Sequence, residues 1–182
     1  MNTAVNQTLI IDEIRNQPSA LESEPFRHFF VQDFFHDSFH RALCAEFEKI
    51  KDKGLCEYLL KSHFSRFGTY DAYYWLLPPE CTYPLNFFYQ PEWKDYFEQL
   101  FNIPLTYDIV AEFHHHKTGS KTGFIHNDYN VCCFTEERLE NGVNPWYYHC
   151  SYDPRHNDMA SGRITPRMRS IALIYYMNNE PW

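Results

Sequence analysis

A histidine and an aspartate stand one residue apart at two places in the 182-residue chain, His126-Asn127-Asp128 and His156-Asn157-Asp158. On an extended backbone, residues i and i+2 point to the same side, so the imidazole and the carboxylate of each motif could converge on one cation. Together they would supply two of the three protein ligands of a two-histidine, one-carboxylate iron site. The alternative for either motif is a surface histidine followed by an aspartate that caps a turn.

The spacing alone is a weak signal, because random placement of ten histidines and ten aspartates gives about half a His-x-Asp motif per chain of this length. Context favours the first copy, which follows the turn at Thr118-Gly119-Ser120 and a predicted short strand at 123–126. The second copy lies in a stretch rich in proline and glycine. Since a rigid site is better built on a strand, His126 and Asp128 are the predicted metal ligands, and His156 with Asp158 are the runner-up pair.

Other residues with metal-binding side chains are less suited to a site. The run His114-His115-His116 cannot place all three rings on one ion, because neighbours on a strand face opposite sides, so we expect polar, exposed strand-end residues. The six cysteines include no C-x-x-C pair, which disfavours a cysteine zinc site. With no export signal at the N-terminus, the cysteines are expected to be reduced thiols in a cytoplasmic protein.

Hydrophobic spacing predicts the elements that position these residues. Apolar residues at spacings of four, four and three predict a helix over 37–53 whose buried face carries Phe39, Leu43, Phe47 and Ile50. A second helix is expected to begin at Pro91-Glu92 and to end at Asn102 and Pro104. Predicted strands cover 71–77, 106–113 and 170–177, of which the last is apolar on both faces and suits the centre of a sheet.

The organisation of the chain favours one domain over 26–182, after a polar lead-in at 1–25 that is poorly ordered or forms a short helix. The segment 129–166 is punctuated by Asn-Gly, Asn-Pro, Asp-Pro, Ser-Gly and Thr-Pro pairs and is expected to be a long loop, of the kind that is functional or mobile. Helices precede most strands and do not alternate with them, which disfavours a parallel α/β fold and favours an α+β, mainly β, class.

Two stretches resemble the 2-oxoglutarate/Fe(II) dioxygenases of the prolyl-4-hydroxylase-like group: 118–128, which contains the first His-x-Asp, and 167–178, which runs from Arg167 through an apolar segment to Asn178. The resemblance implies a double-stranded β-helix, or jelly roll, preceded by helices. It also implies Fe(II) held by His126 and Asp128, with 2-oxoglutarate as co-substrate and hydroxylation of an unactivated C–H in an amino acid, a peptide or a small molecule.

The same resemblance makes further residues candidates for the co-substrate site. The family often has a tyrosine that contacts 2-oxoglutarate where this chain has His116. Tyr175 or Tyr176 is expected to line the co-substrate pocket, because one of two neighbours on a strand must face inward. The family's distal histidine and its basic 2-oxoglutarate anchor follow the strand that here ends near Asn178, so the chain is expected to be C-terminally incomplete, to bind iron weakly and to turn over poorly.

Two alternatives stay open: a non-catalytic jelly-roll binding module, and a zinc hydrolase that uses His126, Asp128 and a late histidine. The net charge of −8 and the absence of a basic run disfavour a nucleic-acid partner. No apolar stretch reaches the roughly 18 residues of a membrane span, so no membrane partner is expected. The third metal ligand, the substrate and the oligomeric state are not fixed by these patterns.

Overall fold

The computed structural model describes residues 10–18, 20–68, 71–121, 131–146 and 164–177. The helices are α1 (Ile10–Glu13), α2 (Asp37–Lys51) and α3 (Glu92–Phe101), with a 3-10 helix η1 (Leu85–Tyr89). The strands are β1 (Leu55–Cys56), β2 (Phe64–Arg66), β3 (Tyr73–Leu76), β4 (Asp108–Ile109), β5 (Glu112–His115), β6 (Val131–Thr135), β7 (Asn144–Pro145) and β8 (Ile164–Met168). Helices and small sheets therefore share one α+β chain, as predicted.

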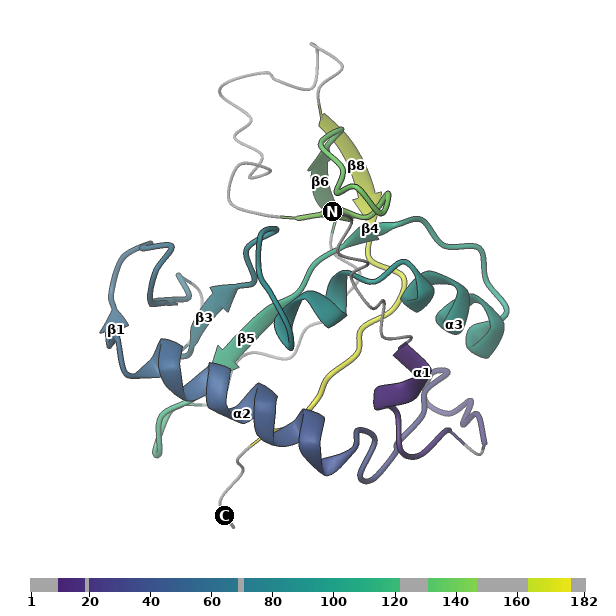
Figure 1. Cartoon of the computed structure of the whole chain (residues 1–182), viewed down its shortest axis with the longest axis horizontal. Coiled ribbons are helices and arrows are strands. Elements are labelled where there is room, and N and C mark those ends of the chain that lie inside the picture. The colour runs from purple at the N-terminus through teal and green to yellow at the C-terminus, as the bar shows by residue number, and fades with distance from the viewer. Residues whose placement is uncertain (1–9, 19, 69–70, 122–130, 147–163, 178–182) are drawn as a thin grey trace, which may run out of the picture.

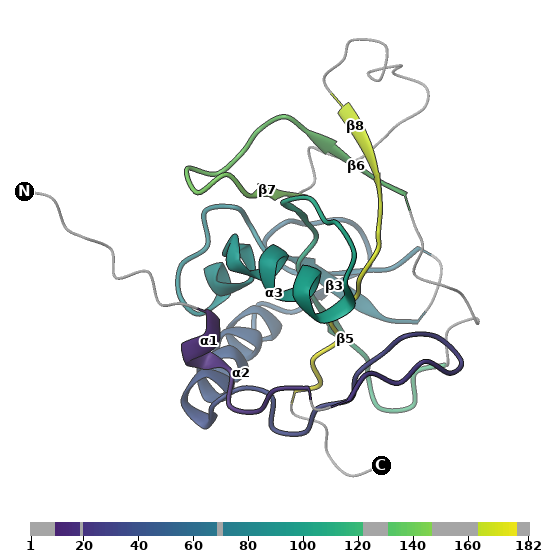
Figure 2. The same ribbon diagram turned by 90° about the vertical axis from the view of Figure 1, so that its right-hand side faces the viewer.

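The strands form three separate sheets. The largest has the order β1-β2-β3-β5, in which β1 and β2 run parallel and the other neighbours run antiparallel. A second sheet pairs β4 with β7 in parallel, and a third pairs β6 with β8 antiparallel. Figures 1 and 2 show the β6–β8 ribbon at the end of the molecule opposite α2. In the described part of the chain these sheets do not close into a barrel.

Helix α2 lies on the four-stranded sheet with the face that the spacing predicted. Phe39, Leu43, Phe47 and Ile50 are all buried, and they are the buried residues of this helix. The ring of Phe47 makes edge contacts with Phe64 of β2 and Phe113 of β5, at centroid distances of 5.3 and 5.5 Å. Burial of this apolar face, rather than helix propensity, is the main stabilisation of such a helix.

The N-terminal end of the same α2 face packs against a cluster of aromatic rings. Phe39 is fully buried, and its ring centroid lies 4.9 Å from that of Phe35 and 4.5 Å from that of Phe87 in η1. Trp93 of α3 closes the cluster with an edge contact to Phe87 and donates its indole N–H to the Phe87 carbonyl at 2.9 Å. The high aromatic content of the sequence is thus used mainly in the core.

Helix α3 ends at Asn102, as predicted, and the structure shows why. Asn102 has φ 51° and ψ 52°, the left-handed conformation that commonly follows a helix and that asparagine tolerates better than most residues. We expect Asn102→Ala to lower the free energy of unfolding by about 1 kcal/mol, because alanine is strained in this conformation. Asn102→Gly should cause no such loss. Urea denaturation of both variants measures the difference, and equal destabilisation by alanine and glycine would contradict it.

Two predictions for residues 106–166 are wrong. The strand expected over 106–113 is split into β4 and β5, which belong to different sheets. The loop expected over 129–166 contains β6, β7 and the start of β8 within its described parts. Of the pairs that suggested a loop, Asn144-Pro145 forms β7 and Thr165-Pro166 lies within β8. Pro166 is tolerated there because β8 pairs with β6 alone among the described strands.

The central strand expected over 170–177 is not formed either. These residues have no regular secondary structure, and in both ribbon views they run as a single trace from β8 past α2 (Figures 1 and 2). The side chains still alternate: Tyr175 and Met177 pack against the core, whereas Ile174 and Tyr176 are 64% and 70% exposed. A strand that is apolar on both faces needs neighbours on both edges, and the described residues provide none.

The N-terminal lead-in is partly folded onto the domain. Ile14, directly after α1, is buried and forms an isolated bridge with Phe35.

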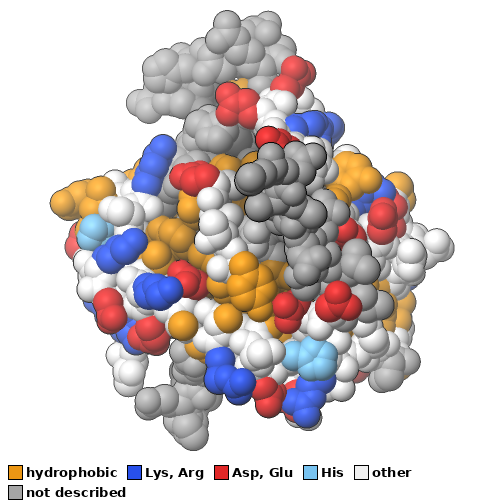
Figure 3. Space-filling view, viewed as in Figure 1, with side chains coloured by type: hydrophobic (Ala, Val, Ile, Leu, Met, Phe, Trp, Pro, Cys, Tyr) orange, Lys and Arg blue, Asp and Glu red, His pale blue; other side chains and the backbone are white. Residues whose placement is uncertain are grey.

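On the face seen in Figure 1, acidic and basic side chains are interspersed (Figure 3). None of the helices in the described ranges combines the length and the apolar character needed to cross a bilayer.

Candidate functional site

The predicted metal ligands lie outside the described residues. His126 and Asp128 fall within 122–130, and the runner-up pair His156 and Asp158 falls within 147–163. Within the described ranges, no group of three or more histidine, cysteine or acidic side chains is placed to hold a metal ion. The metal hypothesis therefore stays a prediction, and the structure informs only on the elements that flank the motif.

The turn that leads toward His126 is tied to the main sheet. The ammonium group of Lys117 donates to the hydroxyl of Tyr73 at 2.9 Å and lies 4.6 Å from the centroid of the Tyr73 ring. The backbone N–H of Lys121 donates to the carboxylate of Asp71 at 3.1 Å. Both partners belong to β3 or to the residues just before it, so the 117–121 turn is held at its two ends.

Behind this turn, Tyr73 donates its hydroxyl hydrogen to Glu57 at 2.8 Å, and Arg66 pairs with the same carboxylate at 2.9 Å. Hydrogen bonds from Tyr73 and then from Arg66 lower the pKa of Glu57. The carboxylate consequently stays ionised and keeps Tyr73 oriented toward Lys117. On the other side of the motif, β6 begins three residues after Asp128.

The expectation that the three consecutive histidines are exposed is confirmed for His114 and His116 and wrong for His115, which alternation along β5 turns toward the core. His114 is exposed, with its Nε2 2.8 Å from Glu112. The ring of His115 packs between Phe47 and Phe64, and this burial, together with nearby Lys51, lowers its pKa. His116, the candidate 2-oxoglutarate contact, is exposed just beyond the strand.

Tyr175 is the inward-facing member of the 175–176 pair, a choice that the sequence left open. Its hydroxyl is hydrogen-bonded to Nδ1 of His40 on α2 at 2.8 Å, and its ring packs against Phe35 at 4.8 Å. Cys44, one turn further along α2, lies 3.5 Å from Nε2 of His40. Burial raises the pKa of Tyr175, so its hydroxyl stays protonated and able to donate. Its role toward a co-substrate remains a prediction.

The cysteines do not form a reactive centre in the described ranges. Cys44, Cys56, Cys81 and Cys132 are free thiols, in line with the expected reduced state. Burial, reinforced by Glu80, raises the pKa of Cys81 to about 12, and burial with Glu48 raises that of Cys44. A raised pKa keeps these two thiols protonated and weakly nucleophilic.

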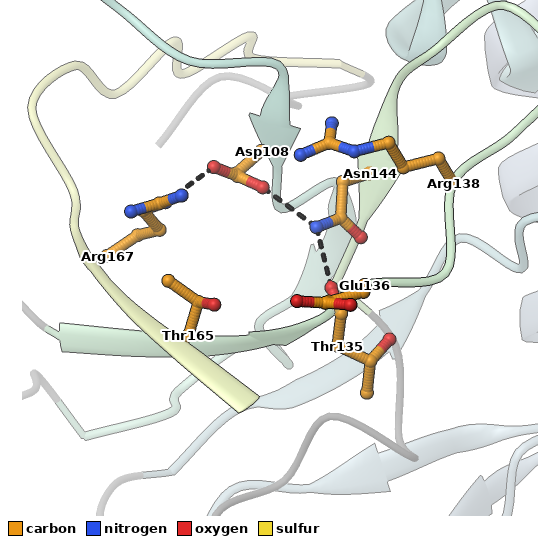
Figure 4. A pocket seen from close by; sticks show the side chains of 7 residues that line it. All are labelled: Asp108, Thr135, Glu136, Arg138, Asn144, Thr165 and Arg167. Carbon is orange, nitrogen blue, oxygen red and sulfur yellow. Dashed lines mark hydrogen bonds and ion pairs between the residues drawn. The ribbon is translucent and has the colours of Figure 1, made fainter. Parts of the chain in front are cut away.

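A polar cavity lies where the β4–β7 pair meets the β6–β8 ribbon (Figure 4). Its volume is about 300 Å³. Every residue that lines it is polar or charged: Asp108, Thr135, Glu136, Arg138, Asn144, Thr165 and Arg167. None of these residues belongs to either His-Asn-Asp motif.

Asp108 is the buried centre of this cavity. Its side chain is 3% exposed, and its Oδ2 accepts from Nε of Arg167 at 2.8 Å. Its Oδ1 accepts from Nδ2 of Asn144, also at 2.8 Å. Burial by itself would raise the pKa of Asp108, but hydrogen bonds from Thr106, Arg167 and Asn144 outweigh it, and the net pKa is lowered. Asp108 is therefore a carboxylate at neutral pH.

Asn144 connects the two small sheets and is 2% exposed. Its backbone N–H donates to the Tyr107 carbonyl at 2.9 Å, and its Nδ2 donates both to Asp108 and to the Thr135 carbonyl of β6. These two acceptors use both hydrogens of the amide nitrogen. The amide oxygen, on the opposite side from Asp108, is buried and has no hydrogen-bond partner among the described residues (Figure 4).

The rim of the cavity is built by β6 and the turn that follows it. Glu136 and Arg138 are both exposed. Nη1 of Arg138 donates to the Gly142 carbonyl at 2.9 Å, and the turn closes with the backbone hydrogen bond from Leu139 to Val143. Gly142 has φ 85°, a conformation in which most other residues are strained. The turn thereby holds the guanidinium of Arg138 over Asn144, as Figure 4 shows.

No family model, no curated protein and no solved structure matches the chain. The function must therefore be argued from the residues themselves.

Sequence reasoning did not find the Asp108 cavity. The alternation over 106–113 places Asp108 on the polar face of a half-buried strand, and Arg167 stands with Arg163 and Arg169 in a basic group, a pattern that is typical of solvated residues. The meeting of Asp108 with Asn144 and Arg167 depends on strand pairing over 36 and 59 residues, which no local pattern specifies.

Proposed function

We propose that this chain is an Fe(II)- and 2-oxoglutarate-dependent oxygenase domain of jelly-roll type that hydroxylates an unactivated C–H of an amino acid, a peptide or a small molecule. The observation that carries the proposal is an order of residues: His126-Asn127-Asp128 after a Gly-containing turn, then the apolar segment from Arg167 to Asn178. Either part alone is common, whereas both in this order resemble the prolyl-4-hydroxylase-like group.

The described elements on either side of the motif are compatible with this proposal. The 117–121 turn is anchored through Tyr73 and Asp71, and β6 starts shortly after Asp128. Well-anchored flanking elements favour the preorganisation that an ion site requires. The α2 face and the aromatic core behind the sheet provide a rigid support.

The side chains of His126 and Asp128 are suitable ligands for Fe(II). A neutral imidazole and a carboxylate are two of the three ligands of non-haem Fe(II) sites, which leave open positions for co-substrates. When bound, Fe(II) together with 2-oxoglutarate supplies dioxygen activation. In this proposal His126 and Asp128 hold the ion, while His116 and Tyr175 are the candidate contacts of the co-substrate. The third protein ligand is not assigned.

Metal binding by matched variants tests the proposal. We expect His126→Ala and Asp128→Ala to weaken Co(II) binding, measured by anaerobic titration, by more than about tenfold, because each removes a direct ligand. His156→Ala and Asp158→Ala are matched controls with the same His-Asn-Asp motif and should bind Co(II) like the unmodified chain. Addition of 2-oxoglutarate should change the Co(II) absorption spectrum only where the ion is bound.

Each other outcome has a defined meaning. If only the 156–158 variants lose Co(II), the wrong motif was chosen. If no variant changes the affinity, the metal proposal fails and a non-catalytic binding module is the better description, for which the Asp108 cavity is the supporting observation. Hydrolytic activity that needs no dioxygen would instead support a zinc hydrolase.

A further inference from the structure

We propose that the cavity around Asp108 binds a small zwitterion that carries one carboxylate and one ammonium group, namely a free α-amino acid. The cavity lies between the β4–β7 pair and the β6–β8 ribbon, and its lining residues are all in the described part of the chain. The inference does not depend on the metal proposal, because none of the lining residues belongs to either His-Asn-Asp motif.

The charge of the lining selects a zwitterion over a simple ion. Arg138 and Arg167 supply two positive charges, and Asp108 and Glu136 supply two negative charges, so the lining residues have no net charge. A phosphate or a dicarboxylate would bring two negative charges to a lining that has no net positive charge, and a simple cation would bring positive charge to a lining that has no net negative charge. A ligand with one charge of each sign can place each beside its opposite.

The guanidinium groups can receive the ligand carboxylate. Arg167 uses Nε for Asp108, and Arg138 uses Nη1 for the Gly142 carbonyl. Each guanidinium has five N–H donors in a planar fork, so both retain donors for a further acceptor. Arg167 approaches from β8 and Arg138 from the turn after β6, on opposite sides of Asp108 (Figure 4). A carboxylate between them would accept charge-assisted hydrogen bonds.

The ammonium group can be received by the rim of the cavity. The carboxylate of Glu136 belongs to an exposed residue of the lining, where a ligand can reach it. Asp108 already accepts from Arg167, Asn144 and Thr106. The amide oxygen of Asn144 has no hydrogen-bond partner among the described residues, but it is buried away from the open space and is not a contact of the ligand. Glu136 is thus the acceptor that an ammonium would meet.

The volume and the polar lining of the cavity restrict which amino acids can bind. A volume of about 300 Å³ is at the lower end of the range for small-molecule sites. The lining contains no apolar side chain apart from the methyl groups of Thr135 and Thr165. Amino acids with small side chains, such as alanine and serine, fit both conditions, whereas large apolar ones would leave their side chains without a partner surface.

Calorimetric titration of the full chain in chelator-containing buffer tests the inference with L-alanine and two analogues. L-Lactate replaces the ammonium by a hydroxyl, and L-alanine methyl ester lacks the carboxylate charge. We expect L-alanine or L-serine to bind and both analogues to bind at least about tenfold more weakly, since each loses a charge-assisted interaction. Absence of binding by both amino acids, or equal binding of L-lactate or inorganic phosphate, overturns the inference.

Variants at the exposed rim locate the site without disturbing the buried network. Glu136→Gln and Arg138→Gln should each weaken L-alanine binding by about tenfold. Glu140→Gln, an exposed acidic residue outside the cavity lining, is the matched control and should bind normally. If the rim variants bind L-alanine like the control, or if all three lose binding equally, the amino acid does not occupy this cavity. The chelator keeps the result separate from the metal proposal.

Discussion

Phe39→Ala is expected to lower the free energy of unfolding by about 3–5 kcal/mol, the range for removal of a fully buried phenylalanine ring. Phe39 has no exposed surface and contacts the rings of Phe35 and Phe87 at centroid distances of 4.9 and 4.5 Å. Alanine would leave a cavity between α2 and η1 that the surrounding rings cannot fill by small movements. Urea denaturation followed by tryptophan fluorescence measures the change.

Phe30→Ala is the control for this prediction. Phe30 is 76% exposed, so removal of its ring should change the free energy of unfolding by no more than about 0.5 kcal/mol. The two variants lose the same atoms and differ only in burial. Equal destabilisation by the two variants would contradict the packing described for the aromatic cluster.

Asp108→Ala is expected to destabilise the protein by about 2–4 kcal/mol at neutral pH. The substitution leaves Nδ2 of the buried Asn144 with one acceptor fewer and removes the ion pair to Arg167. It also disconnects β4 from β8, since this pair joins residues 59 positions apart. The loss exceeds that of an ordinary surface pair because the Asp108 carboxylate is shielded from water.

The destabilisation should depend on pH in a defined direction. The folded-state pKa of Asp108 is lowered, whereas an aspartate in the unfolded chain titrates near about 3.9. The stabilisation by Asp108 is therefore fully present above about pH 4 and is lost as the pH falls through the folded-state pKa. The difference in unfolding free energy between the unmodified chain and Asp108→Ala should accordingly shrink on acidification below about pH 4.

Asp37→Ala is the matched control, because it removes an exposed aspartate–arginine ion pair. Asp37 accepts from Arg15 at 2.9 Å, nearly the same distance as in the Asp108–Arg167 pair, but its side chain is 71% exposed. Its loss should cost no more than about 1 kcal/mol, which includes its favourable place at the start of α2. A cost for Asp108→Ala as small as that for Asp37→Ala would show that the cavity network does not stabilise the fold.

Local patterns predicted the helices well. The spacing of Phe39, Leu43, Phe47 and Ile50 identified the buried face of α2, and Asn102 marked the end of α3. Both depend on interactions within a few residues: side chains three and four apart share a helix face, and a left-handed residue ends the hydrogen-bonded ladder. The tyrosine-rich run at 71–77 likewise contains β3.

Strand partners were predicted less well. The alternation over 106–113 is real, yet its two halves join different sheets, so Asp108 turns into the cavity instead of toward solvent. The apolar segment 170–177 has no paired strand in the described structure, and only its last four residues alternate, which selects Tyr175 over Tyr176 as the inward residue. The period of a strand states which side chains share a face, but it does not state which strand lies beside it.

The sequence by itself determined the α+β class, the positions of α2 and α3 and the two His-Asn-Asp motifs, because each is encoded within a few neighbouring residues. Only the tertiary structure decided that Asp108, Asn144 and Arg167 meet in one polar cavity, where the Asn144 amide oxygen has no partner among the described residues. Such a meeting requires pairing between distant strands, and its free energy comes from burial and hydrogen bonds that exist only once the chain has folded.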